Sequence, residues 1–272
     1  MTNDKTTKID NRTTRSAHGR GRRAGGWVAL SVLLSACGGG NAFSEITPDE
    51  IFNIGLQAYQ AEQWSDAIDA FESVLLTPAF TRAPEARLYM AKAYYGDEKF
   101  ILARSEYQRV LDRYPADTVA PHASLGVCEA FAMASPILQR DQTATQNAWQ
   151  NCSNVARDYA GTLVGLRAAE LQLGMYDKLA EADYLRGKHY YKRGLYDSAL
   201  IFFEDVIEQF PDSEWAPWAM YEMTITFDRI GYTVDAEEFR QRLTTTYPSS
   251  EAAKLVGGNP QGGAGAAAPS EG

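Results

Sequence analysis

Apolar and small residues recur along this chain with the period of amphipathic helices, in paired segments separated by short turns. The clearest pair spans 184–211, where the marks that recur elsewhere are Gly187, Tyr190, Ala199, Phe203, Val206 and Pro211. Small residues let two antiparallel helices approach closely, aromatic residues fill the adjoining space, and proline ends the second helix. The pattern therefore predicts one helix–turn–helix unit, and weaker copies lie on both sides of it.

Five copies of the pattern start at Gly55, Ala91, Gly126, Gly187 and Thr224. They resemble the tetratricopeptide (TPR) repeat, a unit of roughly 34 residues that cannot bury its apolar face alone and stacks on neighbours. The resemblance implies an all-α fold, a right-handed α-solenoid of five TPR helix–turn–helix repeats.

The regular spacing fails twice. In repeat three the second helix arrives about ten residues late, which predicts a long inter-helix loop over Ser135–Thr145. A further excess of about 17 residues separates repeats three and four, and apolar residues recur through it with helical period. We therefore expect one long helix, Leu163 to Arg193, that connects repeat three to repeat four.

These patterns divide the chain into five parts. We expect a signal peptide over 1–36, a tether over 37–47, and TPR repeats one to three over 48–160. The long helix and repeats four and five follow over 161–250. Residues 251–272 are dominated by Gly, Ala, Pro and Ser, which cannot offset the entropy of ordering, so a disordered tail is expected.

The N-terminus has the features of an export signal. A basic segment precedes a short apolar run, Trp27–Leu34, which is far below the ~20 residues of a membrane-spanning helix. The run ends in Leu34-Ser35-Ala36-Cys37, which resembles the bacterial lipobox and implies a diacylglycerol on Cys37. The alternative is an ordinary signal peptide that happens to contain a cysteine. With Gly38 after the anchor, the resemblance implies the outer membrane, with the chain lipid-anchored at its periplasmic face.

The net charge of the chain limits the classes of partner that it can bind. Seven of the 26 Lys and Arg residues and two of the 35 Asp and Glu residues precede Cys37, so the remainder carries 19 basic and 33 acidic groups, a formal net charge of −14. Such a surface argues against nucleic acid as a partner, because phosphates demand cations.

The residues of reactive type indicate no catalytic chemistry. His18, His122 and His189 are isolated, no pair has metal-ligand spacing, and no glycine-rich loop lies between a strand and a helix. We expect no enzyme activity, no cofactor and no metal. Cys128 and Cys152 fall in repeat three, one on each helix, and either a disulfide or two buried thiols fits that placement.

Binding is the function that such a repeat array supports, and the repeat marks indicate two candidate surfaces. In repeats one and two, the outward positions of the first helices suit an extended, partly hydrophobic peptide, and the candidates are Phe52, Leu56, Tyr59, Lys92 and Tyr95. In repeat four, a basic and aromatic patch on an otherwise acidic protein contains Lys188, Tyr191, Lys192 and Arg193. The alternative for both sets is packing against the next repeat or simple solvation.

Several local motifs resemble the BamD family, outer-membrane lipoproteins of the β-barrel assembly machinery. They are the lipobox, the Arg140-Asp141-Gln142-Thr143 loop, the Asp177-Lys178-Leu179-Ala180 helix and the Tyr190-Tyr191-Lys192-Arg193-Gly194 turn. The resemblance implies a non-catalytic scaffold whose first three repeats receive unfolded outer-membrane protein clients. It implies that the last two repeats, around Arg193, dock on the POTRA domain of a BamA-like barrel subunit.

Two other functions compete with this interpretation. One is a periplasmic TPR adaptor that links envelope constriction to peptidoglycan synthesis, although the lipobox and the absence of heptads before Pro48 argue against it. The other is an enzyme with a TPR appendage, but no stretch outside the repeats is long enough for a catalytic domain.

Overall fold

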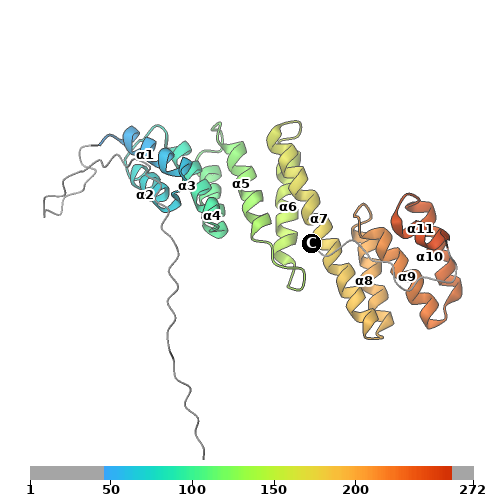
Figure 1. Ribbon diagram of the computed structural model, residues 1–272. Helices are drawn as coiled ribbons and strands as arrows, with labels where there is room; N and C mark the ends of the chain where they lie inside the picture. The colour runs from blue at the N-terminus through green and yellow to red at the C-terminus, as the bar shows by residue number, and fades with distance from the viewer. Residues whose placement is uncertain (1–45, 259–272) are drawn as a thin grey trace, which may run out of the picture. The chain divides into compact units, whose positions relative to one another are not determined.

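The computed structural model describes residues 46–258, and these form helices α1 to α11, joined by turns and, between α5 and α6, by a longer loop (Figure 1). The expected signal peptide, Cys37 and residues 259–272 lie outside the described residues. The helices are α1 Pro48–Gln60, α2 Trp64–Leu75, α3 Ala83–Gly96, α4 Phe100–Arg113, α5 Ala120–Met133, α6 Thr143–Asp158, α7 Leu163–Lys192, α8 Tyr196–Gln209, α9 Ala216–Ile230, α10 Thr233–Thr246 and α11 Glu251–Gly258.

The helices pack as successive antiparallel pairs, which confirms the TPR-like, all-α fold class. Each second helix also contacts the first helix of the next pair, as α2 does α3 and α8 does α9. The first helices contact one another as well, in the order α1, α3, α5 and α7. Stacking therefore builds two connected layers, one of first helices and one of second helices.

Local sequence starts several helices where proline predicts them. Pro48, Pro84, Pro121 and Pro217 each occupy one of the first two positions of a first helix. At α1 the Thr47 side chain accepts a hydrogen bond from the Glu50 backbone N–H, and the Glu50 side chain accepts one from the Thr47 backbone. This reciprocal capping box satisfies donors that the first helical turn leaves unpaired.

Close helix approach depends on the small residue that opens each repeat. A Cβ placed on Gly187 would lie 2.5 Å from Cε1 of Phe203, and one on Gly55 would lie 2.7 Å from Cε1 of Phe71. Both phenylalanines are fully buried. In repeats one and four the glycine and the aromatic ring therefore form one packing unit, as the spacing predicts.

The long connecting helix is α7, with 30 residues. Its first turns pack Val164 and Ala168 into the core of repeat three, and its later turns pack Leu179, Ala180 and Tyr184 into the core of repeats four and five. Thr162 caps its start by accepting the Gly165 N–H, and Arg193 ends it. One helix thus belongs to two cores, and the predicted span is confirmed to within a residue.

The cysteines of repeat three form a disulfide in this structure. Cys128 on α5 and Cys152 on α6 are both fully buried, and their Cα atoms lie 4.9 Å apart. The bond joins the two helices that the long loop separates in sequence, so it closes the one repeat whose own connection is irregular.

The expected disorder from residue 251 is wrong for 251–258, which form α11. Ser250 caps this helix by accepting the Ala253 N–H, and Ala252 and Ala253 are buried in the core of repeats four and five. Within the described residues, α11 is the helix that covers the apolar face of repeat five, and its small side chains let it approach that face closely. Composition alone missed this packing.

None of the described helices has the length and hydropathy needed to cross a bilayer.

Candidate peptide-binding surfaces

The first-helix surface is the face on which α1, α3, α5 and the start of α7 lie side by side. Its side chains are the half-buried Leu56, Tyr59, Tyr89, Lys92, Tyr95 and Glu129, and the exposed Arg167. Four of the five peptide-groove candidates belong to it, because the +1 and +4 positions of the repeat leave side chains partly open to solvent. The structure therefore gathers Leu56, Tyr59, Lys92 and Tyr95 on one layer of helices.

Aromatic rings form the N-terminal part of this surface. Tyr59 packs edge-on against Tyr89 with the ring centroids 5.4 Å apart, and against Trp64 at 5.6 Å. The ammonium of Lys92 lies 5.0 Å from the Tyr89 ring centroid, within cation–π range. Burial raises the pKa of the Tyr59 phenol, with a smaller effect from Tyr89. These rings offer apolar faces with polar edges to a bound chain.

Beyond these rings, charged groups from three helices continue the first-helix surface. Glu129 on α5 lies between Lys92 on α3 and Arg167 on α7, with 3.8 Å between its Oε1 and Nε of Arg167. Burial raises the pKa of Glu129, and the two cations oppose that shift. Burial likewise lowers the pKa of Lys92 and raises the pKa of the Tyr95 phenol, which faces Glu129.

This arrangement has the chemistry to hold an extended peptide. The tyrosines can pack against apolar side chains, and Lys92 and Arg167, which Glu129 and Glu170 balance in charge, can contact a peptide carboxylate. The Arg167 guanidinium is about half exposed and pairs with Glu170 at 2.7 Å, so a ligand carboxylate would compete with the Glu170 side chain. Because the groups come from α3, α5 and α7, stacking of the repeats brings them together.

Phe52 is fully buried, so the expectation that it is exposed in a groove is wrong. Its ring packs at 5.6 Å from Phe71 and 6.1 Å from Phe80, with the Arg82 guanidinium 3.9 Å above it. The same position three residues before the repeat origin is buried at Leu88 and Tyr184. At this position the first helix faces its partner helix and the next repeat.

Lys188 is not a free docking cation, because it forms an ion pair with the buried carboxylate of Glu222 on α9. The Tyr184 hydroxyl donates a second hydrogen bond to the same carboxylate, at 3.3 Å. Burial, together with Glu222, raises the pKa of the Tyr184 phenol. Lys188 therefore joins α7 to α9 inside the fold.

The other three docking candidates lie at the C-terminal end of α7. Lys192 and Arg193 are exposed, and Tyr191 is half-buried against Tyr196 with the ring centroids 5.5 Å apart. The Tyr191 hydroxyl hydrogen-bonds Arg229 of α9 and raises the pKa of that guanidinium. We call Tyr191, Lys192, Arg193 and Arg229 the docking end, a basic and aromatic cluster at the turn of repeats four and five.

Sequence reasoning missed Glu129, Arg167 and Arg229. A signal for Glu129 was available, since the mark three residues after the origin is Tyr94 in repeat two and Tyr190 in repeat four. A carboxylate is unusual at a position that is aromatic in repeats two and four if its side chain serves only to pack against other helices. The contacts of Arg167 with Glu129 and of Arg229 with Tyr191 each join two helices, so no spacing along the chain reveals them. Among the described residues, no cluster of His, Cys, Asp and Glu could hold a metal ion.

The chain matches a family model described as YfiO, outer membrane lipoprotein, over residues 44–243. A relative from Caulobacter vibrioides, outer membrane protein assembly factor BamD, is 23% identical over 228 residues, covering 81% of this chain and 74% of the relative. The factor of the same name from Rickettsia prowazekii is 18% identical and covers 82% and 90%.

Solved structures with similarity to the chain include two TPR-containing proteins. One is described as the complex of the TPR2AB domain of yeast Sti1 with pHSP90. Its TM-score is 0.40 and its sequence identity 13%, and the match covers 77% of this chain and 81% of that chain. MamA has a TM-score of 0.31 and 18% identity, with coverage of 74% and 92%.

Proposed function

Since the chain belongs to the YfiO family of outer membrane lipoproteins, we propose that it is the BamD-type scaffold of outer-membrane protein assembly. In this role it is not an enzyme. It would be held at the periplasmic face of the outer membrane by a lipid on Cys37, which lies outside the described residues. It would aid folding and insertion of outer-membrane proteins by binding both clients and the barrel subunit. The family match over 44–243 is the observation that carries the proposal.

We assign client binding to the first-helix surface. Unfolded barrel proteins present alternating apolar and polar side chains, with apolar and aromatic residues on the lipid-facing side. Tyr59, Tyr89 and Tyr95 are half-buried rings that can accept such side chains without rearrangement of the repeats. Lys92 and Arg167 supply charge for a C-terminal carboxylate, which would fix the direction of the bound segment.

We assign the barrel subunit to the docking end. Lys192 and Arg193 are exposed cations on a chain whose segment after Cys37 is strongly acidic, so they favour an acidic patch on the partner. Tyr191 and the exposed Arg229, which hydrogen-bond each other, lie beside them. A POTRA domain of a BamA-like subunit that presents carboxylates and an apolar contact would fit this surface.

Depletion of the chain in its own cells tests the proposal. If the chain is an assembly scaffold, outer-membrane barrel proteins should fall together, and quantitative proteomics of the membrane fraction measures that fall. Affinity purification from those membranes should recover a barrel subunit with POTRA domains. A defect confined to cell shape or division, with barrel proteins unchanged, would favour the adaptor of peptidoglycan synthesis instead.

A further inference from the structure

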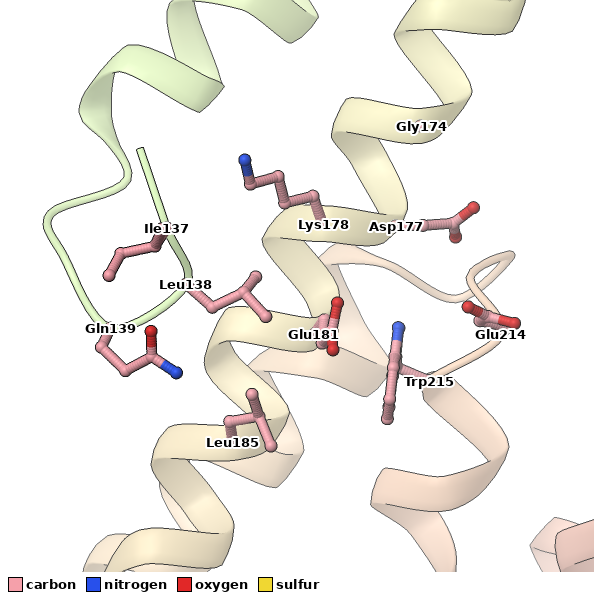
Figure 2. A pocket seen from close by; sticks show the side chains of 10 residues that line it. All are labelled: Ile137, Leu138, Gln139, Gly174, Asp177, Lys178, Glu181, Leu185, Glu214 and Trp215. Carbon is pink, nitrogen blue, oxygen red and sulfur yellow. The ribbon is translucent and has the colours of Figure 1, made fainter. Parts of the chain in front are cut away.

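A cavity of about 580 Å³ lies where the α5–α6 loop, the middle of α7 and the α8–α9 turn meet (Figure 2). Its lining includes Ile137 and Leu138 from the loop, Lys178, Glu181 and Leu185 from α7, and Trp215 at the start of α9. Figure 2 shows that these side chains come from three separate segments. The first-helix surface and the docking end contribute none of the lining residues, so the cavity is a separate feature.

The loop wall of this cavity is held in place by a buried glutamine. The Gln142 side-chain amide donates to the backbone carbonyl oxygens of Ile137 and Arg140, at 2.9 and 3.0 Å. Its carbonyl oxygen accepts a hydrogen bond from the Thr145 hydroxyl of α6, at 2.6 Å. These hydrogen bonds therefore hold the loop in a defined conformation and place Ile137 at the cavity, although 64% of that side chain is exposed.

The opposite wall is fixed as well. The Asp177 carboxylate on α7 accepts a hydrogen bond from the backbone of Glu214, and the Tyr176 hydroxyl accepts one from the backbone of Asp212. The Tyr247 hydroxyl donates to the carbonyl oxygen of Pro211, at 2.8 Å, from the other side of the turn. Because both walls are pre-organised, binding would require little ordering of the protein.

The cavity results from the two irregularities of the repeat pattern. A regular array would place the next helix pair directly against repeat three. Here α7 continues past repeat three before repeat four begins, and the long loop reaches toward the middle of α7. The departures from the repeat spacing thus combine to form one site.

The lining suits an apolar side chain with cationic neighbours. Leu138, Leu185 and Trp215 provide apolar contact, and Ile137 adds an exposed apolar edge. The lining holds three carboxylates, Asp177, Glu181 and Glu214, and one cation, Lys178, whose pKa is lowered by burial. The formal charge of the lining is therefore negative, and the side chain of Glu214 is exposed at the rim.

We propose that this loop–helix cavity is a second peptide-binding site, which takes an apolar side chain flanked by Lys or Arg in an extended segment of a partner polypeptide. The negative lining selects basic flanks, and the fixed walls select an apolar residue that fills the space between Ile137 and Trp215. This site is independent of the client and docking assignments above.

The test uses the purified full-length chain and three fluorescent peptides of equal length. One carries Leu flanked by Lys, the second replaces Lys by Glu, and the third keeps Lys and replaces Leu by Ser. Fluorescence anisotropy should show the Lys–Leu peptide binding at least about tenfold more tightly than the other two. Equal affinity for all three peptides would overturn the proposal.

Matched variants locate the bound peptide. Ile137→Asp and Glu214→Lys should each weaken binding of the Lys–Leu peptide at least about fivefold, because one disrupts the apolar contact and the other reverses the rim charge. Ile201→Asp and Glu208→Lys, exposed changes on α8, should leave the affinity unchanged. Both cavity variants alter exposed side chains and should fold. If Tyr95→Ala abolishes binding while Ile137→Asp does not, the peptide occupies the first-helix surface and the proposal is wrong.

Discussion

Glu222 joins two helices of the C-terminal repeats through its buried side chain. Its buried carboxylate on α9 accepts hydrogen bonds from Lys188 and Tyr184, both on α7. These two contacts therefore hold the C-terminal part of α7, which leads to Lys192 and Arg193, against α9.

Glu222→Ala should lower the free energy of unfolding by about 2 kcal/mol, because it leaves the Lys188 ammonium and the Tyr184 hydroxyl without their acceptor. Chemical denaturation monitored by circular dichroism measures the change. Glu222→Gln keeps one acceptor oxygen and should retain part of the stability. A Glu222→Ala variant as stable as the parent would show that the ion pair contributes no net stability.

Arg193→Glu should weaken recovery of the barrel subunit in a pull-down from solubilised membranes. The change reverses an exposed charge at the end of α7 without removing a described contact, so stability should be unaffected. Arg113→Glu, the same charge change at the exposed end of α4, is the matched control. Equal recovery with both variants would remove Arg193 from the docking end.

At the scale of single elements, α7 combines a tightly packed glycine with an open one. A Cβ on Gly187 would meet the Phe203 ring at 2.5 Å, whereas a Cβ on Gly174 would have nothing within 4 Å. Both residues lie inside the same helix, so the cost of glycine to helix formation is similar at the two sites.

Gly187→Ala should therefore destabilise the fold by about 1–3 kcal/mol through overpacking. Gly174→Ala should stabilise it by about 0.5–1 kcal/mol, because alanine has the higher helix propensity. Thermal unfolding of the two variants side by side checks the difference in sign. Two shifts of the same sign would contradict the close packing of α7 on α8.

The disulfide between Cys128 and Cys152 stabilises the packing of α5 against α6. The chain that it closes spans 24 residues, so loss of the bond should cost about 3 kcal/mol through the entropy of the unfolded state. The double variant Cys128→Ser, Cys152→Ser should melt at a lower temperature than the oxidised parent. The parent treated with reductant should approach the variant, and a parent that does not respond to reductant would contradict this expectation.

At the scale of the whole molecule, membrane attachment depends on one residue outside the described chain. Cys37→Ala removes the site of lipidation that the lipobox predicts, and no described helix can cross a bilayer. The variant should leave the membrane fraction and appear in the soluble periplasmic fraction, as fractionation with immunoblotting will show. Retention of Cys37→Ala in the membrane fraction would contradict anchoring by a lipid.

The amino-acid sequence by itself determined the repeats, most helix starts and the long connecting helix. These features depend on contacts within one helix or one helix pair, where a fixed spacing along the chain becomes a fixed position in space. The small residue at Gly187, the ring of Phe203 and the prolines that start α1, α3, α5 and α9 are all of this kind. The local motifs that resemble the BamD family belong to the same level, and the family match agrees with them.

Only the tertiary structure decided which of these side chains are available to a partner. Phe52 and Lys188 occupy positions that a repeat pattern counts as outward, yet neighbouring helices bury the first and pair the second with Glu222. Glu129 meets Arg167 across two helices, and α11 orders against repeat five. Burial and charge pairing depend on the helix that stacks next, and its side chains are not encoded in the spacing of the helix before it.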